Sequence, residues 1–442
     1  MSSSPPTRHT GKTEWVLAIG VQCIGAVASF VITMGIAALQ GPAAQGLYGL
    51  MRTGADVLVA LGLFGLPQGM VHLINRMDVR PALLDRWFTR YCAALFGLVL
   101  VVGGLAYLGV GHFLVPRWLD HPWSVLAMGV GGIGWVMHGL QRGFVLCRGD
   151  SHRFAWLTAF PALVLLVGVF AQIAVGSQRY EWSLALSGVL SVAFGEWQMR
   201  RLRRDPTWRQ GSDVPLRSVV SSGTYGFAQV LSMALQPYLS LVLMQHWGAS
   251  LSEIGWFVFA GSVYQAFALP AGYASPMIFA RLSEAKANGT NRSLTQALWR
   301  VGWLTAAAGV AGAVLLPIVV PLVFGPQYKS AGWTCAVIAL AGPAILLGRL
   351  GGAVLLGLGR YHLTTVLALV RIVVTPLCMV LAWLTLPLDH ATGAAAGWLL
   401  AETLYCVALL WTARREAGTK TPVAPQADGG AHASSSTRQL HP

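Results

Sequence analysis

Long apolar stretches separated by short polar ones run along almost the whole chain, from Trp15 to Thr412. A helix needs about 20 apolar residues to cross a membrane, and each stretch reaches roughly that length. The pattern therefore predicts an all-α polytopic membrane protein. We expect twelve transmembrane helices, over residues 15–39, 45–74, 91–114, 123–147, 154–176, 182–199, 216–246, 252–280, 295–324, 330–358, 362–386 and 391–413.

Positive residues are distributed unevenly over the connections between these helices. The N-terminus, the even-numbered connections and the C-terminus hold 23 of the 30 Lys and Arg residues, whereas the opposite connections hold three. Cytoplasmic loops carry the excess of Lys and Arg, so we expect both termini in the cytoplasm. The outward connections are short, and none has room for the large outward domain that a glycan polymerase or ligase would carry.

The overall composition excludes several other classes of protein. Hydrophobic residues make up 55% of the 442 residues, only 10% are charged, and the mean hydropathy is +0.60; soluble domains carry about 25% charged residues. The net charge of +14 comes from residues that punctuate apolar spans, so we expect no nucleic-acid partner. The six cysteines show neither disulfide nor CxxC spacing, and we expect no cofactor and no metal.

The chain divides at a basic linker into two halves of six predicted helices. A weak repeat supports the division, because Gly41 and Gly46 at the start of the second span correspond to Gly248 and Gly255 at the start of the eighth. Two such halves have the same orientation, which places a cargo path at their interface. The expected parts are a disordered N-terminus (1–13), an N-terminal bundle (14–199), the linker (200–217), a C-terminal bundle (218–413) and a disordered tail (414–442).

Four arginines lie inside predicted spans, at Arg52, Arg142, Arg349 and Arg371. A charge at the bilayer centre costs about 2.5–3.5 kcal/mol even on insertion scales, so such residues face a protein interior or a wet cavity. Cations in a cavity favour an anionic cargo. Structural alternatives stay open. Arg52 can pair with Asp56 one turn later, and Arg371 with Glu402; Arg142 and Arg349 can extend toward the cytoplasmic headgroups.

Further polar residues inside the spans are candidates for ion coupling or for sugar contacts. Asp56, Glu402, Glu196 and His138 are titratable, and a buried group can change its protonation as its surroundings open and close. For His138, a buried hydrogen-bonded structural role is the alternative. Side chains that suit sugar hydroxyls, or else ordinary interhelical hydrogen bonds, are Gln22, Tyr225, Gln229, Gln236, Tyr264 and Gln265.

An ordered set of short motifs resembles the bacterial polysaccharide flippases, of the O-antigen and exopolysaccharide type. These belong to the multidrug/oligosaccharidyl-lipid/polysaccharide (MOP) exporter superfamily. The matching segments are Gly41…Gly46-Leu47-Tyr48, Gly62…Gly65, Leu140-Gln-Arg142-Gly143 with Arg153-Phe154, Ile254-Gly255-Trp256-Phe257, Pro276…Arg281-Leu282-Ser283, Val323-Phe324-Gly325-Pro326-Gln327-Tyr328 and Leu356-Gly357-Leu358-Gly359-Arg360.

The resemblance implies two six-helix bundles in a V shape, in the bacterial inner membrane. It implies a transporter rather than an enzyme, with an undecaprenyl-pyrophosphate-linked oligosaccharide as cargo, moved from the inner to the outer leaflet for surface polysaccharide assembly. Arginine suits a pyrophosphate group because its planar donor fork matches phosphate oxygens. Membrane lipids are further partners, a polysaccharide polymerase and other assembly proteins remain open, and we expect a monomer. The alternatives are a cation-coupled multidrug exporter of the same superfamily and, ranked third, a glycan polymerase or ligase.

Overall fold

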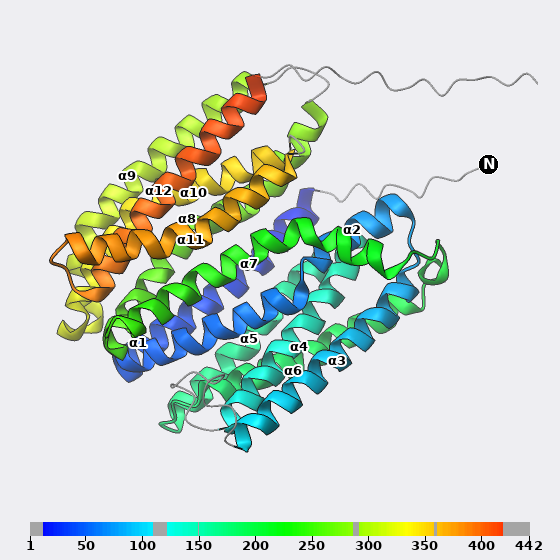
Figure 1. Cartoon of the computed structure of the whole chain (residues 1–442), viewed down its shortest axis with the longest axis horizontal. Helices are drawn as coiled ribbons and strands as arrows, with labels where there is room; N and C mark the ends of the chain where they lie inside the picture. Colours follow the sequence, from blue (N-terminus) through cyan, green and yellow to red (C-terminus); the bar gives the residue numbers. More distant parts are fainter. Residues whose placement is uncertain (1–11, 109–121, 149, 286–290, 358–359, 419–442) are drawn as a thin grey trace, which may run out of the picture.

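The computed structural model describes residues 12–108, 122–148, 150–285, 291–357 and 360–418 (Figure 1). Over these ranges the chain is almost entirely helical. The helices are α1 (Lys12–Leu63), α2 (Leu66–Met77), α3 (Pro81–Tyr107), α4 (Pro122–Cys147), α5 (Ser151–Ala174), α6 (Tyr180–Arg203), α7 (Leu216–His246), α8 (Leu251–Ala285), α9 (Asn291–Phe324), α10 (Lys329–Gly357), α11 (Tyr361–Thr385) and α12 (His390–Gly418), with two 3₁₀ turns, η1 (Pro206–Arg209) and η2 (Pro326–Tyr328).

Ten of the helices in the described part of the chain are long and apolar enough to cross a membrane. One of the ten, Gly20–Leu63, has 44 residues and would reach about 66 Å if straight, roughly twice a bilayer core. It is interrupted at Gly41, whose φ of 85° and ψ of −179° are not helical. The first two predicted spans lie on either side of this kink. Helix α6 is not among the ten, and the total of twelve spans stays a prediction.

Two of the predicted spans have the wrong boundaries. The second, expected as one helix over 45–74, is broken between α1 and α2 because Phe64 (φ 45°) and Gly65 (φ 67°) are left-handed, and Pro67 then starts a new helix. The third, expected from residue 91, begins at Pro81. Proline is well suited to the first position of a helix, and the charged first turns of α3 extend the helix beyond its apolar part.

The helices form two groups that meet along α1, α7 and α8. In Figure 1, helices α3 to α6 lie on one side and α9, α10 and α12 on the other, with α1 and α7 between them. Both groups have their own apolar core, and the core of the second group also takes in Ala37 and Leu50 of α1. The start of α1 and the end of α12 lie toward the same end of the array, while the assignment of that end to the cytoplasm stays a prediction.

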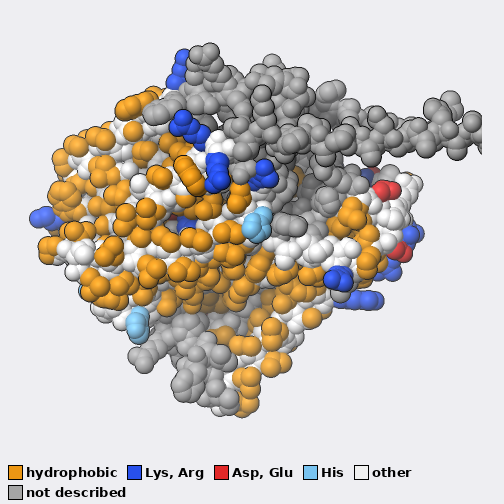
Figure 2. All heavy atoms as spheres, turned by 45° about the horizontal axis from the view of Figure 1, so that its top comes forward, with side chains coloured by type: hydrophobic (Ala, Val, Ile, Leu, Met, Phe, Trp, Pro, Cys, Tyr) orange, Lys and Arg blue, Asp and Glu red, His pale blue; other side chains and the backbone are white. Residues whose placement is uncertain are grey.

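The outer surface exposes more apolar side chains than the surface of a water-soluble protein does. In α9, Leu322 is 80% exposed and Leu304 is 71% exposed, whereas contiguous apolar patches on soluble monomers rarely exceed a few hundred Å². Figure 2 shows hydrophobic side chains over most of the described surface on one face, with most of the Lys and Arg toward the top and right of the view. The chain is therefore a multi-pass membrane protein.

The two segments of the weak repeat pack against each other. A Cβ added at Gly46 would overlap the Leu251 carbonyl, and one added at Gly255 would overlap the Pro42 carbonyl. Only glycine at these positions lets α1 and α8 approach backbone to backbone. This contact, residues 42–49 against 251–258, is called the glycine contact below. It joins the two groups at the end of the array opposite the start of α1 (Figure 1).

The basic linker folds onto the first group of helices. Arg203 at the end of α6 donates to both carboxylate oxygens of Asp85 in α3, at 2.8 and 3.1 Å, and also pairs with Glu196. Hydrogen bonding to Asp85, and then to Glu196, raises the pKa of the Arg203 guanidinium, against the opposing effect of burial. Beyond it, Trp208 of η1 is buried against Phe144, with ring centroids 5.1 Å apart. The linker is thus packed against α3 and α4.

Candidate functional site

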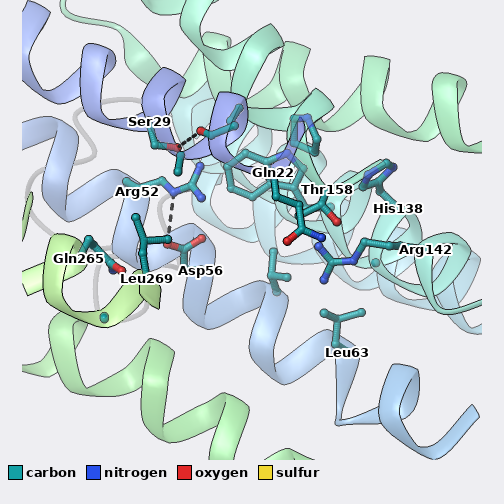
Figure 3. A pocket seen from close by; sticks show the side chains of 18 of the residues that line it. Gln22, Ser29, Arg52, Asp56, Leu63, His138, Arg142, Thr158, Gln265 and Leu269 are labelled. Atoms are coloured by element: carbon teal, nitrogen blue, oxygen red, sulfur yellow. Dashed lines mark hydrogen bonds and ion pairs between the residues drawn. The ribbon is translucent and has the colours of Figure 1, made fainter. Parts of the chain in front are cut away.

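A cavity of about 510 Å³ lies between the two groups of helices, and Figure 3 shows the side chains that line it. Helices α1, α4 and α5 form one wall, and α8 and α10 form the other. Three of the four predicted arginines reach it. The polar and charged lining residues are Gln22, Ser29, Arg52, Asp56, His138, Arg142, Thr158, Gln265 and Arg349, and apolar lining residues include Val59, Leu63, Trp135, Ala268 and Leu269.

Each cavity arginine rests on the face of an aromatic ring. The guanidinium carbon of Arg52 lies 4.3 Å from the centroid of the Trp135 ring. Arg142 lies 5.6 Å from the centroid of Phe154, and Arg349 lies at the same 5.6 Å from that of Tyr264. A guanidinium is attracted to an aromatic face within about 6 Å. Stacking holds the planar group while leaving the donors on its edge free for a ligand.

The charges in the lining do not cancel. Arg52 donates from Nε to Asp56 Oδ2 at 3.2 Å, as predicted from their spacing, and both side chains stay partly exposed. Arg142 and Arg349 make no ion pair within the described residues. Three guanidinium groups against one carboxylate leave a net charge of +2 with His138 neutral. Uncompensated charge of one sign in a cleft attracts counter-ions.

The predicted sugar contacts divide into two sets. Gln22 of α1 and Gln265 of α8 line the cavity from opposite walls, and Figure 3 shows Gln22 on the side of Arg142. Gln236 and Tyr264 belong instead to a buried network in the second group of helices. Gln229 is exposed and is not part of the lining. The side chain of Tyr225 lies outside the described residues.

Arg371 and Glu402 form a buried ion pair behind the cavity wall. Their side chains are only 7% and 3% exposed, and Arg371 Nη2 donates to Glu402 Oε1. Gln236 Nε2 donates to the same carboxylate oxygen at 3.2 Å, and the Arg371 guanidinium lies 4.8 Å from the centroid of the Tyr405 ring. Arg371 and Glu402 do not line the cavity, so the structure favours the pairing alternative over a cargo contact for this arginine.

Tyr264 connects this buried pair to the cavity. Its hydroxyl accepts from Arg371 Nη2 at 2.8 Å and lies 3.4 Å from Glu402 Oε1, while its ring supports Arg349. One residue of α8 thus contacts charged groups on α10, α11 and α12. We interpret Tyr264 as a positioning residue for Arg349 rather than as a direct cargo contact.

Replacing Tyr264 with phenylalanine or with leucine separates these two roles. Tyr264→Phe keeps the ring and loses the hydroxyl, so it is expected to cost about 1 kcal/mol of stability and to leave anion affinity nearly unchanged. Tyr264→Leu also removes the ring and is expected to weaken anion affinity about 3- to 10-fold, since a cation–π contact is worth about 0.5–2 kcal/mol. The measurement is the equilibrium affinity for an anionic, pyrophosphate-containing ligand.

The control for this pair is Tyr405→Leu, which removes the ring over Arg371, a residue outside the cavity lining. Equal losses of affinity in Tyr264→Phe and Tyr264→Leu would contradict the positioning role of the ring.

His138 occupies an unusual environment on the cavity wall. Its Nε2 lies 2.6 Å from the Leu157 carbonyl of α5, and its Nδ1 lies 2.8 Å from the Ser191 carbonyl of α6. The predicted hydrogen-bonded role is present. Glu196, the fourth titratable candidate, is not in the lining and is held by Arg203.

The ring that supports Arg52 was missed at the level of sequence, although a signal was present. Trp135, His138 and Arg142 have the i, i+3, i+7 spacing of residues on one face of a helix. Reading that face as a unit would have placed Trp135 beside the histidine and the arginine. The contact of Trp135 with Arg52 of α1 depends on tertiary packing and has no local signature. Within the described residues, no group of three or more His, Cys, Asp or Glu could hold a metal ion.

Solved structures of known fold resemble the chain over most of its length, although no family model and no curated protein matches it in sequence. It is similar to the inward-facing conformation of a multidrug resistance MATE family transporter of the MOP superfamily, with 14% identity over 91% of this chain and 98% of that one, and a TM-score of 0.68. Lipid II flippase MurJ, in an inward closed conformation, gives 10% identity over 91% and 88% of the two chains, and a TM-score of 0.70.

An outward-facing MATE transporter of the same superfamily matches with 15% identity over 92% of this chain and 97% of that one, at a lower TM-score of 0.57. The chain therefore has the MATE- and MurJ-like fold. These neighbours are transporters and a flippase. Their shared fold does not specify the polysaccharide cargo that the motifs suggest.

Proposed function

We propose that this protein is a flippase for a lipid-linked oligosaccharide that carries a pyrophosphate group, acting by alternating access. The observation that carries the proposal is the net charge of +2 on the cavity lining, from arginines that face a shared space between the two groups of helices. A pyrophosphate diester carries about two negative charges, one for each phosphate. Fixed guanidinium donors would replace the water that the anion loses on leaving the headgroup region.

The remainder of the cavity suits the other parts of such a cargo. Gln22, Gln265, Ser29 and Thr158 offer amides and hydroxyls to sugar hydroxyls. The volume of about 510 Å³ lies in the range of small-ligand pockets, about 300–1,000 Å³, so it holds a headgroup and not a long isoprenoid. In this proposal the lipid tail remains in the bilayer while the headgroup passes between the two groups of helices, from the inner to the outer leaflet of a bacterial inner membrane.

The alternative is a cation-coupled multidrug exporter, since several structural neighbours are MATE transporters. A cationic drug would have to approach three guanidinium groups with one carboxylate for compensation, and Asp56 is already paired with Arg52. The sign of the cavity charge therefore favours the anionic cargo.

The deciding experiment is transport in proteoliposomes that contain the full chain. We expect a labelled undecaprenyl-pyrophosphate glycan to be moved between leaflets faster than in protein-free vesicles, and the same glycan on an uncharged lipid to be moved poorly. Ethidium, a cationic drug, should not be transported. Transport of ethidium without movement of the pyrophosphate-linked glycan would overturn the proposal in favour of the drug exporter.

A further inference from the structure

Both ring nitrogens of His138 face hydrogen-bond acceptors. Nε2 lies 2.6 Å from the Leu157 carbonyl oxygen and Nδ1 lies 2.8 Å from the Ser191 carbonyl oxygen. Neutral imidazole has one N–H and one lone pair, so it can donate to only one of these two carbonyls. In either neutral tautomer the other nitrogen turns its lone pair toward an oxygen. The imidazolium form has two N–H groups and satisfies both carbonyls.

The Leu157 carbonyl is available for a structural reason. In an α-helix it would accept from the backbone N–H four residues later, but that residue is Pro161, which has none. Proline within α5 thus leaves the buried Leu157 carbonyl without its usual backbone donor, so this carbonyl needs a hydrogen-bond donor from another helix. His138 of α4 supplies it through Nε2. Ser187 of α6 donates to the Pro161 carbonyl at 2.8 Å and holds the same part of α5 in place.

We propose that His138 is a proton-binding site of the cavity, and that it takes up a proton when an anionic cargo binds. The inference rests on the proposed function, because the cargo supplies the negative charge. Without cargo, burial of the ring and Arg142 one turn away both oppose a second positive charge. A bound anion compensates Arg142, and the imidazole then accepts a proton from cavity water to form its second hydrogen bond.

Among the described residues, the carboxylates near this site are held by other groups and do not compete with His138 for the proton. From α1, Arg52 and Asp56 line the same cavity but are paired with each other. From α6, Glu196 follows Gly195, which lies against the His138 ring, but its carboxylate is held by Arg203. From α5, the contact is the Leu157 carbonyl itself. In the described parts of α2 and α3, which also pack on α4, no charged group contacts this ring.

Binding of the proton and binding of the anion then strengthen each other. Protonation raises the net charge of the lining from +2 to +3, so the protonated site binds the anion more tightly. By thermodynamic linkage, the bound anion increases the affinity of His138 for a proton by the same factor. The cavity should therefore bind a pyrophosphate-linked cargo more tightly as pH falls. Cargo affinity is expected to fall about 3- to 10-fold over the two pH units in which the cargo-bound histidine loses its proton.

Proton uptake on cargo binding tests the inference directly. The full chain, in weakly buffered detergent, is mixed with undecaprenyl-pyrophosphate glycan, and protons taken up are measured with a pH indicator. A pyrophosphate diester has no group that titrates between about pH 6 and 8, so any uptake belongs to the protein. We expect up to about one proton per bound cargo in the wild type, none in His138→Gln, and wild-type uptake in His246→Gln, which changes an exposed histidine at the end of α7.

A second variant keeps the histidine and changes the partners of its acceptor, at Pro161, which also lines the cavity. Pro161→Ala returns a backbone N–H to α5, which competes with His138 for the Leu157 carbonyl. We expect the midpoint of proton uptake to move to lower pH, by up to about one unit. Cargo binding without proton uptake, or uptake that persists in His138→Gln, would overturn the proton site and leave the flippase proposal standing. No binding of the pyrophosphate glycan by the wild type at any pH would overturn both.

Discussion

Replacing Arg142 or Arg349 with alanine is expected to slow flipping of an undecaprenyl-pyrophosphate glycan about 10- to 100-fold. Each substitution removes a charge-assisted contact worth about 1.5–3 kcal/mol, and about 1.4 kcal/mol corresponds to a factor of ten. Both side chains face the cavity on an aromatic support without an ion pair in the described residues. The double variant should fall to the rate of protein-free vesicles. The measurement is the initial rate in proteoliposomes at equal protein density.

Two further variants decide whether geometry matters in addition to charge. Arg349→Lys keeps a positive charge but loses the planar fork and its stacking on Tyr264, so an intermediate rate is expected. Arg201→Ala is the matched control, because Arg201 also stacks on an aromatic ring, Trp197 at 4.9 Å, but is exposed and not part of the cavity. It should flip cargo at the wild-type rate. Wild-type rates in both Arg142→Ala and Arg349→Ala would exclude charge capture as the mechanism.

Glu402→Gln is expected to destabilise the folded protein by about 3–5 kcal/mol. The substitution keeps the shape of the side chain but leaves the Arg371 guanidinium, only 7% exposed, without its counter-charge. Removing one partner of a buried ion pair is costly because the remaining charge is neither hydrated nor neutralised. The free energy of unfolding can be measured by titrating the detergent-solubilised protein with SDS.

Adding Arg371→Met to the same chain should restore most of that stability. The unpaired cation is then gone, and the amide introduced at position 402 can still accept from Gln236 and Tyr264. As a control, Asp213→Asn breaks a largely exposed pair with Arg80, 3.4 Å apart, and should change stability by less than about 1 kcal/mol. If Glu402→Gln were as stable as the wild type, Glu402 would have to be protonated in the folded protein, and the pair would not be ionic.

The fold was predictable because its main signals are local. Apolar length locates the helices, and the short ordered motifs predicted a fold of the kind that the MATE and MurJ structures have. The errors have local causes too. The length of an apolar stretch does not show that Phe64 and Gly65 adopt left-handed conformations that split it. The mean hydropathy of a window does not show that α3 starts at Pro81, because the first turns of this helix are charged.

The candidate site was only partly predictable, since the position of a charge along a helix does not specify the direction in which it points. The sequence predicted four arginines inside spans, and three of them line the cavity. Asp56 follows Arg52 one turn later, and the two form their ion pair on the cavity wall. Arg371 faces the opposite way, into the network of Glu402, Gln236 and Tyr264. The orientation of Arg371 depends on contacts with other helices, to Glu402 of α12 and to Tyr264 of α8, which is 107 residues away in sequence.

The glycine contact between α1 and α8 bears on how easily the protein changes state. At Gly46 and Gly255 the backbones of α1 and α8 touch directly, so no side chain interlocks the two helices at these two positions. The closed and open arrangements can then differ by only a few kcal/mol. In such a balanced equilibrium, a cargo that prefers one arrangement by about 1.4 kcal/mol changes the ratio of the two tenfold. The same glycines that allow close packing would thus let a modest difference in cargo affinity set the direction in which the cavity opens.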